Sequence, residues 1–148
     1  MVRGNLLAGK GAELRKRICV IDGQDVGIGV TLIKSLRAAY GESVELFALG
    51  TNAVATSQMM KADANRGASG ENAIVRTVLE ADIIIGSISI TRANAMLGEV
   101  TPRIAEAVTS CPAPKILLPL TQERVQLVGL VKEPLPHLAK VLVEEKIK

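Results

Sequence analysis

The sequence is poor in aromatic residues and in the two residue types that build most nucleophilic and zinc sites. Its 148 residues include no tryptophan, one tyrosine, one phenylalanine, one histidine and two cysteines. With only one tyrosine and one phenylalanine, the chain has no aromatic platform on which the bases of single-stranded nucleic acid could stack. The histidine and cysteine content excludes a His/Cys zinc cluster and a disulfide framework. We therefore expect reduced cysteines at Cys19 and Cys111, no metal and no nucleic-acid partner.

Long hydrophobic runs are also missing. Every apolar run meets a charge, a glycine or a proline well before the roughly 18 residues that a membrane-spanning helix needs. No signal-peptide pattern precedes a small-residue cleavage site. We expect a cytoplasmic protein with no membrane contact. Because the mean hydropathy is nevertheless +0.30, we expect extensive burial within the fold and between subunits, with a homodimer as the assembly.

Net positive charge is confined to the first residues. The net charge is +3, and residues 1–17 carry five basic residues against Glu13: Arg3, Lys10, Arg15, Lys16 and Arg17. The rest of the chain therefore has no net positive field to hold a polyanion. This distribution predicts a flexible basic N-terminal extension over residues 1–16 and one domain over residues 17–148.

Short apolar runs alternate with helical periodicity along that domain. Strands are predicted at Arg17–Asp22, Val44–Leu49, Asp82–Gly86, Lys115–Pro119 and Val125–Gly129. Helices are predicted at residues 28–40, 52–62, 70–80, 91–97, from Thr101 onward and after His137, with a loop at Asp63–Gly70. Strands alternating with helices indicate an α/β protein. The expected fold is a small Rossmann-like three-layer α/β/α sandwich with a mostly parallel sheet of about five strands.

A glycine-rich turn lies between the first predicted strand and the first helix. It has the spacing Gly23-x-x-x-Gly27-x-Gly29, which resembles the nucleotide fingerprint of short-chain dehydrogenases. Glycines let backbone amides approach a ligand, and a helix N-terminus favours an anion. The turn therefore predicts a phosphate or nucleotide site whose amides come from Gly23, Gln24, Gly27, Ile28 and Gly29.

A purely structural reading of the turn stays open. Asp22 and Asp25 flank it and repel a pyrophosphate unless a cation intervenes. In the structural reading Asp22 hydrogen-bonds the turn and Asp25 points to water. In the ligand reading Arg66 or Arg92 supplies the compensating charge.

Polar residues after the second and third predicted strands complete the expected pocket. Thr51 and Asn52 follow Gly50, and Ser87 follows Gly86. Thr51 or Asn52 is also suited to capping the next helix. No acidic residue stands at the end of the second strand, which argues against ribose recognition of the usual NAD kind.

Familiar catalytic sets are absent. Tyr40 has Val44 four residues on, so the Tyr-x-x-x-Lys pair of short-chain dehydrogenases is excluded. The one histidine, His137, stands alone between prolines and the final helix, and no Gly-x-Ser-x-Gly elbow occurs. The sequence therefore identifies no catalytic residue, and enzymatic activity stays an open question.

Several stretches together resemble a bacterial family of small, uncharacterised proteins known as a domain of unknown function. They are Ile21–Gln24 with Gly27–Gly29, Ala48–Asn52, Ala64–Gly67 with Gly70–Ala73, Ala93–Glu99 and Glu133–Leu138. The resemblance implies a Rossmann-like fold and carries no catalytic residues.

The function expected from the residues is binding of a nucleotide or phosphometabolite. The cofactor, a nucleotide or dinucleotide, is not identified by the sequence. The alternative is a non-catalytic sensor, a partner-binding subunit or a structural homo-oligomer whose turn holds no ligand.

Overall fold

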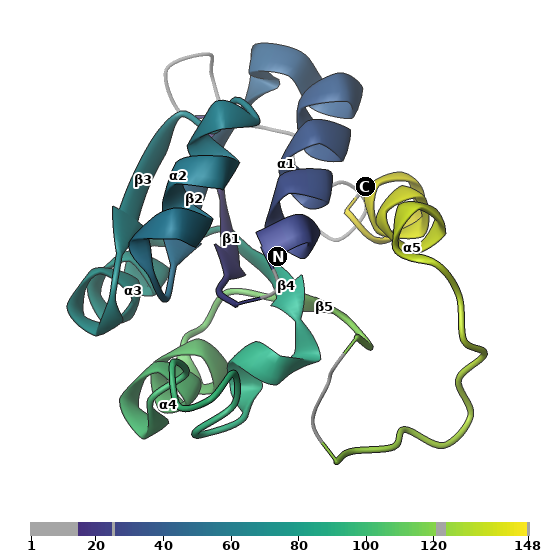
Figure 1. The fold of residues 1–148 in the computed structure, drawn as a ribbon. Helices are drawn as coiled ribbons and strands as arrows, with labels where there is room; N and C mark the ends of the chain where they lie inside the picture. Colours follow the sequence, from purple (N-terminus) through teal and green to yellow (C-terminus); the bar gives the residue numbers. More distant parts are fainter. Residues whose placement is uncertain (1–14, 25, 121–123, 148) are drawn as a thin grey trace.

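The structure is a computed structural model that describes residues 15–24, 26–120 and 124–147 (Figure 1). Its strands are β1 (Lys16–Asp22), β2 (Val44–Gly50), β3 (Arg66–Ser69), β4 (Ile83–Ser87) and β5 (Lys115–Leu118). Its helices are α1 (Val26–Tyr40), α2 (Ala53–Lys61), α3 (Glu71–Thr77), α4 (Pro102–Ser110) and α5 (Leu135–Val141). Short 3₁₀ turns are η1 (Gly41–Ser43), η2 (Val78–Glu80) and η3 (Ile88–Thr91), and a single π-helical turn, η4 (Leu142–Lys146), follows α5.

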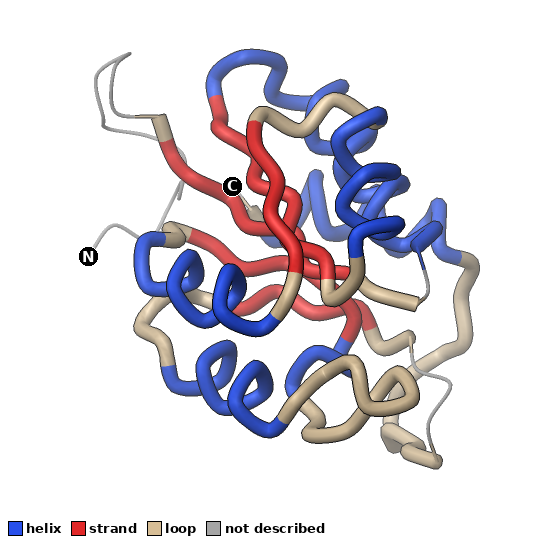
Figure 2. Tube along the Cα trace, turned by 60° about the vertical axis from the view of Figure 1, so that its left-hand side comes forward, coloured by secondary structure: helices blue, strands red, loops and turns tan. Residues whose placement is uncertain are grey.

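The five strands form one parallel sheet in the order β3-β2-β1-β4-β5. Helices cover both faces (Figures 1 and 2), so the predicted three-layer α/β/α sandwich is confirmed. Parallel pairing needs this double cover because the strands are apolar on both sides. β1 shows it directly, since residues 18–21 are all buried.

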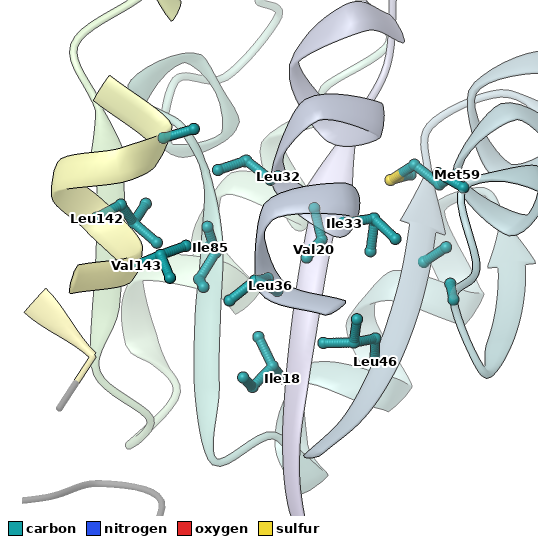
Figure 3. Packing of buried hydrophobic residues seen from close by; sticks show 14 of the residues in the cluster. Ile18, Val20, Leu32, Ile33, Leu36, Leu46, Met59, Ile85, Leu142 and Val143 are labelled. Carbon is teal, nitrogen blue, oxygen red and sulfur yellow. The ribbon is translucent and has the colours of Figure 1, made fainter. Parts of the chain in front are cut away.

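Strand alternation divides the interior into two cores. Ile18 and Val20 point toward α1, α2 and α5, whereas Cys19 and Ile21 point toward α3, α4 and η3. Figure 3 shows the first core, in which Leu32 and Leu36 of α1 pack over β1 and Leu142 packs near β4. The sheet is packed between these two cores, and the loops of the candidate site emerge from its carboxyl-terminal edge.

The structure corrects three predicted elements. The predicted loop at Asp63–Gly70 contains β3, an exposed edge strand that pairs with β2 alone. Val125–Gly129 is not a strand but part of an extended segment between β5 and α5. Residues 91–97 do not form a helix; η3 ends at Thr91 and turns follow.

The predicted basic extension lies mostly outside the described residues. Within it, Lys16 already belongs to β1, and the Arg15 guanidinium donates to the Glu42 carbonyl at 3.0 Å. In the part of the chain that the structure describes, every helix is too short or too polar to cross a bilayer.

Burial governs the chemistry of Cys19. Both cysteines are free and buried, and burial raises the pKa of the Cys19 thiol to about 12. The folded chain therefore keeps this proton at a pH where an unfolded cysteine, with a pKa near 8.5, has lost it. It follows that Cys19 favours folding below that reference pKa and that this contribution is lost as the pH rises toward about 12.

Removal of the thiol should flatten the alkaline loss of stability. Between about pH 8 and about pH 10 the free energy of unfolding of the natural chain should fall by about 2 kcal/mol more than that of Cys19→Ala. Urea unfolding of both proteins at the two pH values measures the difference. Parallel pH dependences would contradict the assignment.

Candidate functional site

The candidate site lies at the carboxyl-terminal edge of the sheet, between β1 and β4. These strands are neighbours, but α1 leaves β1 toward one core and η3 leaves β4 toward the other. Connections that diverge in this way mark the topological switch point of a parallel sheet, and ligands of such sheets bind beyond the strand ends there. The glycine-rich turn follows β1 and Ser87 ends β4, so both lie at this switch point, which we call the crevice.

The buried carboxylate of Asp22 holds the turn. Asp22 is 1% exposed. Its Oδ1 accepts from the Gly23 amide at 2.8 Å, and its Oδ2 accepts from the Gly29 amide at 2.6 Å. The hydrogen bonding that the structural reading expected of Asp22 is therefore present, while Asp25 lies outside the described residues. One acidic side chain already satisfies two of the amides predicted to bind a phosphate.

Packing explains both of these glycines. A Cβ on Gly23 would lie 2.2 Å from Thr51 Oγ1 and 2.7 Å from Met96 Sδ. A Cβ on Gly29 would lie 2.6 Å from Met59 Sδ and 2.8 Å from Asp22 Oδ2. Gly23 and Gly29 are thus required by close contacts inside the protein.

The remaining turn residues divide between core and surface. The Ile28 side chain is buried beneath α1, whereas Gln24 and Gly27 are exposed. A Cβ on Gly27 would meet no atom of the described residues within 4 Å. Open space therefore borders the first turn of α1 at Gly27.

Thr51 and Asn52 follow β2 and contact a carboxylate from a distant part of the chain. Asn52 Oδ1 accepts from the Ala55 amide at 2.8 Å, which confirms its predicted capping role. Thr51 Oγ1 donates to Glu99 Oε1 at 2.7 Å, and Asn52 Nδ2 donates to the same oxygen at 3.0 Å. Glu99 is a site residue that the sequence analysis missed.

A left-handed turn delivers Glu99 to this position. Positive φ angles occur at Asn94 (69°), Met96 (58°), Leu97 (55°) and Gly98 (92°). For residues with a side chain this conformation costs about 1–2 kcal/mol each. The Asn94 amide donates to the Val100 carbonyl at 2.6 Å and closes the turn. Backbone strain of this kind clusters at active sites and ligand-binding segments.

The two predicted cations occupy different places. Arg92 directly follows η3, beside the crevice, and is half-buried. Arg66 opens β3 and pairs with Phe47, in the middle of β2. Because strands rise about 3.3 Å per residue, Arg66 lies roughly 10 Å short of the site's edge. Along the chain Arg92 follows β4 by one short turn, whereas Arg66 lies away from the carboxyl-terminal edge of the sheet.

Ser87 links the crevice to an apolar cavity. Its Oγ donates to the Leu120 carbonyl at 2.7 Å and accepts from the Ser89 amide at 2.9 Å. Leu120 also lines a cavity of about 230 Å³, whose apolar walls include Val125, Leu130 and Leu138. With about 4.8 Å between neighbouring strands, β5 lies roughly 10 Å from β1. A ligand the size of a nucleotide spans that distance.

His137 and Tyr40 lie away from the candidate site and make structural contacts. His137 Nε2 pairs with Glu133 at 2.8 Å on the protein surface, and Tyr40 Oη donates to the Val143 carbonyl at 2.8 Å. Burial raises the pKa of Tyr40. No group of three or more His, Cys, Asp or Glu side chains suited to a metal ion occurs within residues 15–24, 26–120 and 124–147.

Comparison with known proteins gives a family and a distant structural likeness. The family model described as "Domain of unknown function (DUF3842)" matches residues 17–148, so the chain belongs to this family. No curated protein matches. A universal stress protein solved in complex with cAMP is similar at 17% identity and a TM-score of 0.41, covering 70% of this chain and 95% of that chain. The resemblance to a domain of unknown function is confirmed.

Loss of the Asp22 charge should loosen the turn. An amide group in Asp22→Asn has one oxygen where the carboxylate has two, so one of the two backbone donors loses its acceptor. The free energy of unfolding should fall by about 1–3 kcal/mol. Asp63→Asn is the control, because the Asp63 side chain is 72% exposed and pairs only with Arg37, and it should cost at most about 1 kcal/mol. Equal losses in the two variants would remove the special role of Asp22.

Proposed function

We propose that this member of the DUF3842 family is a nucleotide- or phosphometabolite-binding protein. The observation that carries the proposal is the sheet order β3-β2-β1-β4-β5, which puts a glycine-rich turn and a helix N-terminus at the switch point between β1 and β4. This point is the ligand crevice of doubly wound sheets. The likeness of the turn to the short-chain dehydrogenase fingerprint supports the same class of ligand.

The phosphate lies on the first turn of α1. Because the amides of Gly23 and Gly29 already donate to Asp22, the phosphate accepts instead from the amides of Gly27 and Ile28. Gly27 borders open space. The first amides of a helix have no partner within it, and the helix dipole favours an anion there. Arg92 offsets the negative charge of Asp22, which would otherwise repel the phosphate.

The remaining polar residues frame the pocket. Thr51 and Asn52 border it on the β2 side, and Ser87 borders it on the β4 side. The apolar cavity at the end of β5 accepts the base or another apolar group. Because the described residues at this edge include no acid–base pair suited to catalysis, the proposal covers binding and assigns no reaction. A cytoplasmic location is part of the proposal, supported by the two free cysteines.

A nucleotide should stabilise the protein against heat. At 100 times its dissociation constant a ligand contributes about 2.7 kcal/mol. The measurement is a thermal-shift panel of nucleoside monophosphates, ATP, NAD(P) and flavins, together with native mass spectrometry of the purified protein. Arg92→Ala should reduce the shift, whereas Arg66→Ala, a matched loss of one charge away from the crevice, should leave it unchanged. Absence of any shift and of any copurified nucleotide would overturn the proposal, and equal effects of the two variants would remove Arg92 from the site.

A second proposal is self-association as a homodimer. Three large apolar side chains of the segment between β5 and α5 are strongly exposed: Val128 (102%), Leu130 (54%) and Val131 (79%). Contiguous exposed apolar residues of this kind mark interaction sites. The segment follows β5, an edge strand of the sheet, and loops away from the sheet before α5 begins (Figure 1). Edge strands are usually covered.

A charge in that segment should separate the subunits. Sedimentation velocity should show a dimer for the natural chain and a monomer for Val128→Lys. Leu79→Lys, at a 60% exposed apolar residue on the opposite face of the molecule from α1, should remain dimeric. A monomeric natural chain would contradict this second proposal.

A further inference from the structure

We propose that Glu99 is the ribose-binding acid of this site and that the ligand is a ribonucleotide with free 2′- and 3′-hydroxyl groups. This inference rests on the proposed nucleotide-binding function and specifies its substrate class. It comes from one contact, the hydrogen bonds of Thr51 and Asn52 to the Glu99 carboxylate.

The position of Glu99 is the first argument. In dinucleotide-binding sheets an acidic residue at the end of the second strand binds the ribose hydroxyls. Here β2 ends in Gly50, followed by Thr51 and Asn52, with no acid. The Glu99 carboxylate is hydrogen-bonded to both of these residues, so a carboxylate occupies that position although it comes from a turn 47 residues beyond Asn52.

Contacts with β1 place the same carboxylate beside the turn. The Thr51 amide donates to the Asp22 carbonyl at 2.9 Å. A Cβ built on Gly23 would lie 3.2 Å from Glu99 Oε1. Glu99 therefore adjoins the glycine-rich turn, and the first turn of α1 follows two residues after Gln24. A phosphate on α1 and a ribose at Glu99 belong to one ligand.

The hydrogen bonding leaves part of the carboxylate available. Thr51 and Asn52 both donate to Oε1. Across residues 15–24, 26–120 and 124–147 no residue donates to Oε2, and Glu99 is only half-buried. A carboxylate oxygen accepts two hydrogen bonds. Vicinal hydroxyl groups are donors that match such an oxygen. The two hydrogen bonds to Oε1 hold the carboxylate in place for these hydroxyl groups.

The chemistry selects among nucleotides. A 2′-deoxyribose removes one donor, and a hydrogen bond to a charged group contributes about 1.5–3 kcal/mol, or roughly tenfold to a hundredfold in affinity. A 2′-phosphate adds negative charge against the Glu99 carboxylate. The site therefore favours ribonucleotides over deoxyribonucleotides and over 2′-phosphorylated nucleotides.

The alternative role for Glu99 is a latch that fastens its strained turn to β2. Glu99→Gln separates the two roles, because the glutamine oxygen still accepts from Thr51 and Asn52 while the group at Oε2 becomes a donor without charge. A latch predicts that both stability and ligand preference stay nearly intact, because its two hydrogen bonds survive in the variant. A ribose-binding acid predicts a change in preference with the melting temperature nearly intact.

Isothermal titration tests the inference with the four nucleoside 5′-monophosphates and their 2′-deoxy counterparts. The natural chain should bind the best ribonucleotide at least roughly tenfold more tightly than its deoxy form. Glu99→Gln should weaken ribonucleotide binding by a similar factor and abolish the preference. Glu106→Gln, which removes an exposed carboxylate from α4, should behave like the natural chain.

The outcomes separate the two proposals. Equal affinity of the natural chain for ribo- and deoxyribonucleotides overturns the role of Glu99 and leaves nucleotide binding in place. A preference that persists in Glu99→Gln also overturns it. Failure of all eight nucleotides to bind the natural chain overturns the inference for Glu99, whereas the binding proposal falls only if the wider thermal-shift panel and native mass spectrometry are also negative. The comparison of sugars in the natural chain holds even if the variant folds poorly.

Discussion

One buried carboxylate organises the functional edge of this protein. Asp22 ends β1, is removed from water, and is stabilised there by the amides of Gly23 and Gly29. A buried charge without such donors costs several kcal/mol, so the turn must fold around it and α1 must start where it does. The carboxylate also takes the place at which an anion would meet those amides. In our proposal a ligand phosphate therefore binds farther out, at the exposed first turn of α1 near Gly27.

A second carboxylate, that of Glu99, lies at this edge of the sheet. Glu99 is joined to the end of β2 by Thr51 and Asn52, and the left-handed residues Met96 and Leu97 hold it there at a cost in backbone energy. Glu99 beside β2 supplies a carboxylate acceptor, and the first turn of α1 supplies backbone amides. A molecule that carries both hydroxyl donors and a phosphate matches this arrangement, and a ribonucleotide is such a molecule.

The sequence predicted the fold where local pattern and burial agree. Ile83–Ile85 lacks any polar face and had to be a strand covered on both sides, and the glycine turn after Asp22 had to join a strand to a helix. Prediction failed where tertiary contacts decide. β3 contains Arg-Gly-Ala-Ser, whose composition is that of a loop, and it is a strand because β2 offers an unpaired edge. Val125–Gly129 has the composition of a strand but no partner in the described chain. Glu99 could not be linked to Asn52 because no spacing rule connects residues so far apart.

The central claim is that ligands bind at the carboxyl edge between β1 and β4, above the Asp22-held turn. Backbone NMR of the isotope-labelled protein, titrated with a ribonucleoside monophosphate, tests this claim most directly. Binding at this edge should shift the amide signals of Gly27, Ile28, Thr51 and Ser87. The amide signals of Arg17 and Val44, at the opposite edge of the sheet, should not shift. Perturbations confined to that opposite edge, or a spectrum that does not change, would contradict it.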